Sequence, residues 1–428
     1  MDFFLIGKLM NSNVNQAVIP EIVAPAGSME SFSAALNARA DAIYVGIRDY
    51  NMRASSEAFG IKQIREMISR AHDRGTKFYL ALNIIAYDNQ LSEIARILDS
   101  LADAGADAVI LWDMGILRLA KEREFKIHLS TQASVSNTES ATFYESLGVK
   151  RIVLARELSL GQIKKAVESA HHRESEMTFE CFVHGAMCIA VSGRCLTSQF
   201  FSGRSANCGD CLQPCRRKYR ITDIQEGDEM ILNGHTVMSA KDLCTIDILD
   251  HIIGTGVSAL KIEGRMRETL YVKTAVECYR EARDAVLDGS YSETLAGMLK
   301  ERLSRVFNRG FSHGFYFSRP DLDIAESEGS ISKYVKDYAG RIVNFYKKAG
   351  AADVQLEARG ISLGDTVLVT GPTTGALEFT ADSIRSPENI SAETSARGEL
   401  IGLALPSRAR TGDKVFVLVS RDRQKGKE

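Results

Sequence analysis

Eight short apolar runs constrain the fold of this chain more than any other feature of its sequence. They alternate with longer stretches in which apolar residues recur at helical spacing, as at Ile61, Ile64, Met67 and Ile68. Such alternation is typical of βα units around a parallel sheet, and eight units over roughly 270 residues predict an α/β fold, a (β/α)8 TIM-like barrel. The runs are residues 21–25, 42–47, 77–83, 108–112, 126–130, 151–155, 177–183 and 259–262.

The segments outside these runs differ from them in sequence pattern. After an N-terminal extension, residues 1–20, we expect the barrel over residues 21–290, with a long cysteine-rich insertion at about residues 185–258, after the seventh strand. A helical or extended connector should follow over residues 291–335. From residue 336 onward, short alternating runs separated by glycine turns predict a small β-barrel domain over residues 336–428.

Composition excludes several classes of protein. The chain has 428 residues, 45% of them hydrophobic, which is ample material for a packed core. Its 53 lysines and arginines against 55 aspartates and glutamates leave a net charge of −2, so a nucleic-acid surface would have to be local. No run approaches the roughly 18 apolar residues that span a bilayer. We therefore expect a cytoplasmic protein without a membrane partner.

Polar residues end or follow most of the predicted strands. Because barrel enzymes bind their substrates at the carboxyl ends of the strands, these residues together predict a lined pocket there, although each one alone could be an ordinary loop residue. They are Asn83, Asp113, Thr131 with Gln132, Arg156 with Glu157, His184, and Glu263 with Arg265.

Six of the eight cysteines fall within 35 residues, 181–215. In a reducing compartment such a cluster indicates metal binding or catalysis rather than disulfide bonds. Cys188, Cys195, Cys211 and Cys215 are the best ligand candidates, and their wide spacings favour an iron–sulfur cluster over one zinc ion. The Cys208–Cys211 pair, a C-x2-C motif, keeps zinc as a second choice. Cys181 and Cys278 are expected to be buried free thiols, and Cys244 is ambiguous.

Cations and aromatic residues surround this cysteine cluster. Such a mixture suits an unstacked nucleotide, with phosphates on the cations and bases on the rings. It would equally suit a small dicarboxylate, or offset the charge of a thiolate-bound cluster, and the residues alone leave these alternatives open. The residues are Arg194, Phe200, Phe201, Arg204, Arg216, Arg217, Lys218, Tyr219 and Arg220.

The same region resembles a known family. Residues 180–188 read Glu-Cys-Phe-Val-His-Gly-Ala-Met-Cys and residues 192–198 read Ser-Gly-Arg-Cys-Leu-Thr-Ser, which is similar to the signature of the collagenase-like peptidase U32 family. Shorter matches are Ala-Pro-Ala-Gly at 24–27, Arg-Ser-Ala-Asn at 204–207, Gln-Pro-Cys-Arg at 213–216, Lys-Asp-Leu-Cys at 241–244, Lys-Ile-Glu-Gly-Arg at 261–265 and Asn-Arg-Gly-Phe at 308–311. The resemblance therefore covers the whole barrel and the connector.

The resemblance implies oxygen-independent hydroxylation of the wobble uridine of tRNA to 5-hydroxyuridine, with prephenate as the hydroxyl donor. It implies a 4Fe-4S cluster on Cys188, Cys195, Cys211 and Cys215; Cys208 departs from the pattern and puts in doubt which thiol of the C-x2-C binds. Expected partners are tRNA, the small dicarboxylate donor and a homologous partner subunit.

Two alternative functions stay open. The family name implies a peptidase, for which His184 lies four residues before Cys188, whereas the H-E-x-x-H motif of metallopeptidases is absent. The other alternative is a non-catalytic RNA-binding subunit with a structural metal site.

The candidate residues fall into two groups beside the cysteines. The candidate catalytic residues are Glu180, His184, Arg156 and Glu263. The candidate substrate-binding residues are Arg53, Asn83, Gln132, Arg194, Phe200, Arg204, Arg216, Arg217, Tyr219, Lys261 and Arg265.

Overall fold

The computed structural model describes residues 19–51, 59–209, 211–222, 224–227, 229–231, 238–317, 324–325 and 329–421. The predicted N-terminal extension, residues 1–20, therefore lies almost entirely outside the described residues, as does Arg53.

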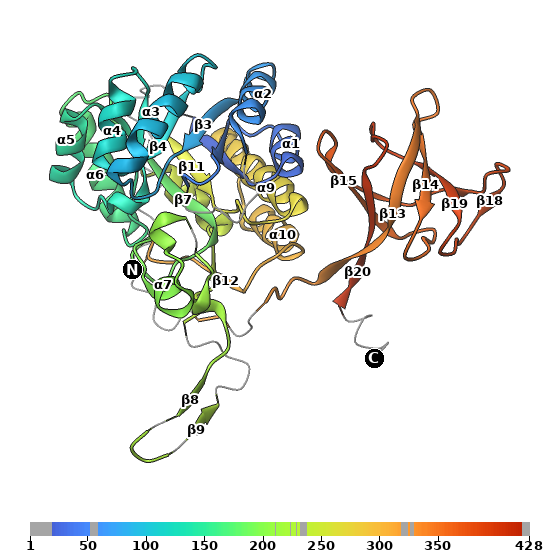
Figure 1. The fold of residues 1–428 in the computed structure, drawn as a ribbon. Coiled ribbons are helices and arrows are strands. Elements are labelled where there is room, and N and C mark those ends of the chain that lie inside the picture. The colour runs from blue at the N-terminus through green and yellow to red at the C-terminus, as the bar shows by residue number, and fades with distance from the viewer. Residues whose placement is uncertain are drawn as a thin grey trace.

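Eight parallel strands form a closed barrel, which confirms the predicted fold class (Figure 1). Each strand pairs with the next in sequence order, and the eighth pairs with both the first and the seventh, so that the sheet closes. The strands are β1 (Glu21–Ala26), β2 (Ala42–Gly46), β3 (Lys77–Ala81), β4 (Ala108–Leu111), β5 (Ile127–Leu129), β6 (Val149–Val153), β7 (Thr178–Ala186) and β11 (Ala259–Ile262).

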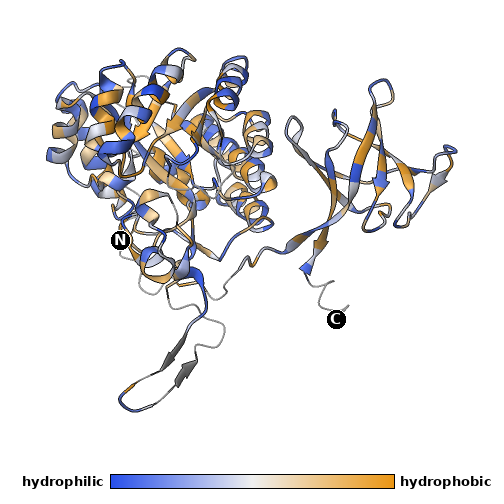
Figure 2. Cartoon of the chain, in the orientation of Figure 1, coloured by the Kyte–Doolittle hydropathy of each residue, from blue (hydrophilic) through white to orange (hydrophobic). Residues whose placement is uncertain are grey.

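Helices cover the outside of this barrel. In α2 three of the residues that the spacing marked, Ile64, Met67 and Ile68, are buried, and Ile61 at the start of the helix is partly buried. The barrel strands are predominantly hydrophobic, whereas the helices alternate between hydrophobic and hydrophilic faces (Figure 2). The covering helices are α1 (Met29–Asn37), α2 (Ile61–His72), α3 (Asp88–Ala102), α4 (Met114–Lys121), α5 (Thr138–Ser146), α6 (Leu160–His172), α8 (Leu249–Ile253) and α9 (Thr269–Asp288).

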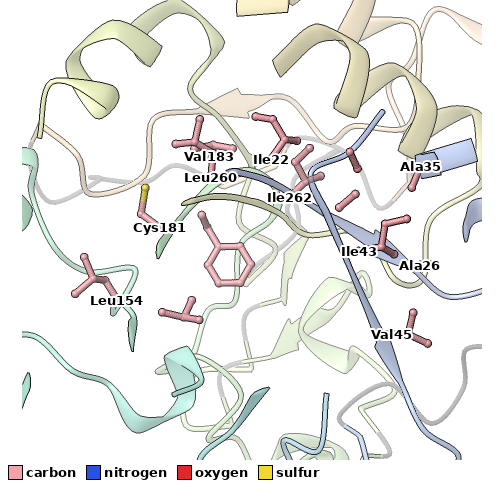
Figure 3. Packing of buried hydrophobic residues seen from close by; sticks show 14 of the residues in the cluster. Ile22, Ala26, Ala35, Ile43, Val45, Leu154, Cys181, Val183, Leu260 and Ile262 are labelled. Atoms are coloured by element: carbon pink, nitrogen blue, oxygen red, sulfur yellow. The ribbon is translucent and has the colours of Figure 1, made fainter. Parts of the chain in front are cut away.

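Alternate residues of each strand point to opposite sides of the sheet, and both sides are buried. The larger core contains Ile22, Ile43, Val183 and Leu260 (Figure 3). A smaller cluster of strand residues that includes Val23, Tyr44, Tyr79 and Ala81 forms a second core. The alternation places Tyr44 on the opposite face of β2 from Ile43.

The insertion after β7 contains α7 (Thr197–Ser202), three short 3-10 turns, η3 (Ala206–Cys208), η4 (Pro214–Arg216) and η5 (Ile246–Ile248), and the hairpin β8 (Arg220–Thr222) with β9 (Glu229–Ile231). It also contributes β10 (Asp242–Cys244), which runs antiparallel to β7. Parallel to β10 lies β12 (Phe311–Ser312), which follows α10 (Glu293–Ser304) in the connector. Two strands that the sequence pattern did not predict thus extend the barrel sheet.

The C-terminal region is an eight-stranded antiparallel sheet around a hydrophobic core of its own. It contacts the barrel at α1, where Ser33 Oγ donates to the carbonyl of Pro372 (2.5 Å) and Asn37 Nδ2 donates to that of Thr374 (3.0 Å). Its strands are β13 (Tyr334–Tyr346), β14 (Ala351–Leu356), β15 (Thr366–Gly371), β16 (Gly375–Thr380), β17 (Ile384–Arg385), β18 (Ser391–Ala392), β19 (Leu400–Ala404) and β20 (Lys414–Ser420).

No helix in the described part of the chain combines the length and the apolar character needed to cross a membrane.

Candidate active site

A cavity of about 120 Å³ lies where the carboxyl ends of the barrel strands meet the insertion. The strand ends contribute one part of its wall, and the segment from Ala186 to Arg216 contributes the rest. The barrel contributes ten polar or aromatic residues to the cavity wall, namely Tyr44, Asn83, Ser130, Thr131, Gln132, Arg156, Phe182, Lys261, Glu263 and Arg265. The prediction of a lined pocket at this end of the barrel therefore agrees with the structure, except that Asp113, Glu157 and His184 do not line it; Asp113 instead caps the start of α4.

The four predicted ligand cysteines all line this cavity. Cys188 follows β7, Cys195 precedes α7, Cys211 lies between η3 and η4, and Cys215 lies within η4. All four are free thiols, and burial raises the pKa of Cys215. In the described residues no three potential ligands are close enough together to hold one metal ion. Four thiols on the wall of one cavity are a donor set that suits either an iron–sulfur cluster or a zinc ion.

The structure separates the two thiols of the C-x2-C motif. Cys211 lines the cavity, whereas Cys208 does not, and the sulfur of Cys208 lies 3.8 Å from the hydroxyl of Tyr87. Cys181, Cys244 and Cys278 are buried and also do not line the cavity. The donor set at the cavity is thus the four cysteines named from their spacing.

Hydrogen bonds between distant segments hold the cysteine-bearing loop against the barrel. Arg194 Nε donates to the carbonyl of Gln132 (2.9 Å), and the backbone amide of Ile85 donates to the carbonyl of Asn207 (3.2 Å). Within the loop, Ser198 Oγ accepts from the amide of Leu212 (3.1 Å), which ties α7 to the segment that carries Cys211. Both ends of the loop are therefore positioned by contacts far apart in sequence.

Four cations, Arg156, Arg216, Lys261 and Arg265, line the cavity opposite a single carboxylate, Glu263. Arg156 Nη1 donates to the carbonyl of Ala186, and Arg216 Nη2 donates to that of Met187, both at 2.8 Å.

Two of these guanidinium groups each have a buried N–H donor without a hydrogen-bond partner among the described residues. Arg156 Nε and Arg216 Nη1 are buried and make no hydrogen bond to any described residue. Because an unsatisfied buried donor is costly, these two atoms favour an anion in the cavity.

Tyr44 lies beside two of the cations in the cavity wall, and it was not among the predicted site residues. The ammonium of Lys261 lies 4.6 Å from the Tyr44 ring centroid, and the guanidinium of Arg265 lies 5.6 Å from it. Its hydroxyl donates to the carbonyl of Ile262 (3.0 Å) and lies 3.3 Å from Glu263 Oε2. Burial raises the pKa of Tyr44, so it stays a donor. The one signal in the sequence is its position in the second apolar run, where it points to the opposite face of the strand from Ile43 and Val45.

Asn83 and Gln132 are also brought together at the cavity wall. Asn83 Nδ2 donates to Gln132 Oε1 (2.6 Å), and the hydroxyl of Ser130 lies 3.1 Å from the same oxygen. Both residues line the cavity as predicted, and their contact fixes the orientation of the two amides.

Two predicted catalytic residues, Glu180 and His184, do not line the cavity. Glu180 is fully buried in the barrel, where its carboxylate binds Lys261 (2.6 Å) and lies 3.6 Å from Arg151.

The ring of His184 packs on Tyr271 and Tyr279, and burial lowers its pKa to about 4. No contact in the described chain joins it to Cys188. In the described part of the chain, Glu180 and His184 therefore lie outside the lining of the cavity that contains Cys188.

The outer surface of the insertion carries the predicted RNA-binding residues. Thr197 and Ser198 of α7 line the cavity, while Phe200 on the same helix is 83% exposed. Phe201 and Tyr219 pack together with ring centroids 6.0 Å apart. The guanidinium of Arg194 lies 5.1 Å from the Trp112 ring, and Arg204 and Arg217 are exposed.

Comparison with known proteins agrees with the resemblance seen in the sequence. The model of peptidase family U32 matches residues 27–325. The chain is 40% identical over 407 residues to an uncharacterized protease of Methanocaldococcus jannaschii, covering 94% of this chain and 98% of that protein. It is 35% identical over 409 residues to a collagenase of Porphyromonas gingivalis, with coverage of 94% and 98%. It is 31% identical over 371 residues to tRNA hydroxylation protein P1 of Bacillus subtilis, with coverage of 85% and 86%. The chain therefore belongs to peptidase family U32.

Proposed function

We propose that this protein modifies RNA by hydroxylation, converting the wobble uridine of tRNA to 5-hydroxyuridine with a 4Fe-4S cluster and with prephenate as the hydroxyl donor. The observation that carries the proposal is that four cysteines and four cations line one cavity at the mouth of the barrel. The Bacillus subtilis relative, named for tRNA hydroxylation, supports the choice of RNA as the substrate.

The cysteines account for the redox part of the reaction. Replacing the C5 hydrogen of uridine by a hydroxyl group is a two-electron oxidation of the base. The two electrons must pass to an electron acceptor outside the protein, and a cluster held by Cys188, Cys195, Cys211 and Cys215 would supply the electron transfer toward it. Thiolate ligands carry negative charge, which Arg216, adjacent in sequence to Cys215, is placed to offset.

The cations account for the binding of the donor. A dicarboxylate such as prephenate presents two planar anions, and guanidinium groups bind such anions through paired hydrogen bonds. Arg156 and Arg216 each have a buried N–H donor that makes no hydrogen bond to a described residue. The cationic groups of Lys261 and Arg265 lie near the ring of Tyr44. These side chains would bind and orient the donor and exclude water from it.

The exposed residues of the insertion account for the binding of RNA. The ring of Phe200 is free to stack on an extruded base, and Phe201 with Tyr219 forms a second apolar surface. Arg204 and Arg217 are exposed and suited to phosphates. The substrate base would reach the cavity past α7.

The functional test combines the purified protein with its proposed substrates. Protein purified without oxygen should be brown and contain iron and sulfide. With prephenate and tRNA that lacks the modification, mass spectrometry of the nucleosides should show uridine heavier by one oxygen atom. Failure to form this nucleoside with cluster-loaded protein would refute the proposal. Cleavage of collagen or casein by metal-free protein would instead establish the peptidase alternative.

The two neighbouring thiols provide a matched test of the metal site. We expect Cys211→Ser to lose most of its iron, because Cys211 lines the cavity, and Cys208→Ser to keep it, because Cys208 faces Tyr87. Iron and sulfide content per chain is the measurement. Equal iron loss in both variants would show that the ligand set is wrong. Stoichiometric zinc in place of iron would favour a structural site.

A further inference from the structure

Lys261 has two features of a reactive amine: its side chain is buried, and it lines the cavity. It lies on β11, is 4% exposed, and lines the cavity. Its ammonium lies between two rings, 4.6 Å from the centroid of Tyr44 and 5.7 Å from that of Phe182. Lys261 therefore brings an amine held between two aromatic rings to the cavity wall.

A proton acceptor lies within hydrogen-bonding distance of this nitrogen. Glu180 Oε1 is 2.6 Å from Lys261 Nζ, and Glu180 is fully buried beneath the cavity. Its second oxygen, Oε2, accepts no hydrogen bond from the described residues, and Arg151 lies 3.6 Å from it. Burial lowers the pKa of Lys261, which favours the neutral amine that nucleophilic attack requires.

Two guanidinium groups flank the lysine on the same two rings. Arg156 lies 3.8 Å from the centroid of Phe182, and Arg265 lies 5.6 Å from that of Tyr44. An anion bound by either arginine would therefore be held near Lys261. The ligand that satisfies both features carries a carboxylate next to an electrophilic carbonyl.

We propose that Lys261 forms a reversible imine with the carbonyl carbon of a 2-oxo carboxylate bound between Arg156 and Arg265. This inference rests on the proposed function only in taking the hydroxyl donor, whose side chain ends in a 2-oxo carboxylate, as the ligand. The covalent step itself requires neither the cluster nor RNA.

The step balances without any redox change. Glu180 accepts a proton from the ammonium, and the free amine adds to the carbonyl carbon, forming one carbon–nitrogen bond. Glu180 then returns its proton to the lysine nitrogen, which passes two protons in turn to the oxygen; the carbon–oxygen bond breaks, and the oxygen leaves as water, so that the nitrogen keeps one proton. The product is an imine that water can hydrolyse, and Arg156 and Arg265 keep the carboxylate in place throughout.

Reductive trapping tests the inference in the full-length protein. We would incubate the protein with pyruvate and sodium cyanoborohydride, measure the intact mass, and map the modified peptide. The expected result is one reduced adduct per chain, on Lys261. Because mapping is done on the wild-type protein, the outcome does not depend on a variant that folds.

Two matched variants sharpen the test. Lys261→Arg keeps the positive charge beside Glu180 but cannot form the imine, so the adduct should be lost. Lys126→Arg changes an exposed lysine and should leave the adduct unchanged. Circular dichroism checks that both variants fold.

An unmodified Lys261, or adducts spread over exposed lysines, would overturn the imine. If uridine hydroxylation proceeds without an adduct, the imine alone is wrong. If the adduct forms and hydroxylation does not, the proposed function alone is wrong.

Discussion

At the scale of single residues, the effect of an ion pair on stability depends on how far the pair is buried from water. Glu180 and Lys261 are both buried, whereas Glu176 and Lys150 form a pair of the same chemistry, 3.0 Å apart, that is largely exposed. Removing one partner of a buried pair leaves the other charge desolvated, while water compensates an exposed one. Glu180 therefore holds Lys261 at the cavity floor rather than acting on a substrate itself.

This contrast gives a prediction on stability. Glu180→Ala should lower the free energy of unfolding by about 3–5 kcal/mol, because Lys261 loses its counter-charge. Glu176→Ala should change the same quantity by less than about 1 kcal/mol. Urea unfolding followed by circular dichroism measures both. Similar values for the two variants would show that the Glu180–Lys261 pair is not desolvated.

At the scale of elements, the amino ends of the barrel strands are joined by a second set of charges. Glu21 on β1 binds Arg151 on β6 across the barrel (2.7 Å) and also Lys77 on β3. Burial alone would raise the pKa of Glu21, but hydrogen bonds from Arg151, Lys77 and Tyr79 lower it from 4.5 to about 2. This link therefore ties three strands together only while Glu21 is ionised.

The lowered pKa predicts a contribution to stability that depends on pH. The unfolded chain binds the Glu21 proton near pH 4.5 and the folded chain near pH 2. The contribution is therefore complete above about pH 5, and about 3 kcal/mol is lost as the pH falls to 2. Urea midpoints measured across this range should fall less steeply in Glu21→Gln than in the wild type. Parallel profiles would contradict the assignment, and Glu176→Gln, as a control, should follow the wild-type profile.

At the scale of the whole molecule, the contact between the barrel and the C-terminal sheet includes one close approach of the two backbones. Gly375, at the start of β16, has a positive φ of 70°, and a side chain there would lie 2.7 Å from the backbone nitrogen of Ala34 on α1. Around it Ala34, Leu368 and Ala376 form a small hydrophobic cluster shared by the two domains. A larger residue at this position would separate the surfaces without entering either main core.

Two glycine variants separate this steric effect from backbone strain. Gly375→Ala should weaken domain contact, seen as faster proteolysis of the connector and a larger radius of gyration. Gly364→Ala places alanine at a similar φ of 81° with no atom within 4 Å, so it should keep the domains together. Equal behaviour of the two variants would assign the effect to strain at positive φ rather than to the domain contact.

Part of this molecule was predictable from the sequence because the information is local. Alternation and helical spacing report which face of a segment is buried, so the eight strands and α2 could be read from neighbouring residues. The unusual density of cysteines likewise marked the six in residues 181–215 as a group, and their spacing singled out Cys188, Cys195, Cys211 and Cys215. The polar strand ends located the pocket for Asn83, Thr131, Gln132, Arg156, Glu263 and Arg265.

Other features depended on contacts between distant segments, which no local pattern encodes. The strands β10 and β12 have three and two residues, too few to show a period. They form because β7 continues beyond Glu180, where its pairing with β6 ends, so that β10 can pair with residues 184–186 and β12 with β10. Only the tertiary structure decided that Cys211 rather than Cys208 faces the cavity, and that His184 turns toward Tyr279. The sequence by itself determined the barrel and its set of thiols, because periodicity and composition act over a few residues. The fold decided which side chains meet in the cavity, because that depends on how the long loop packs back on the barrel.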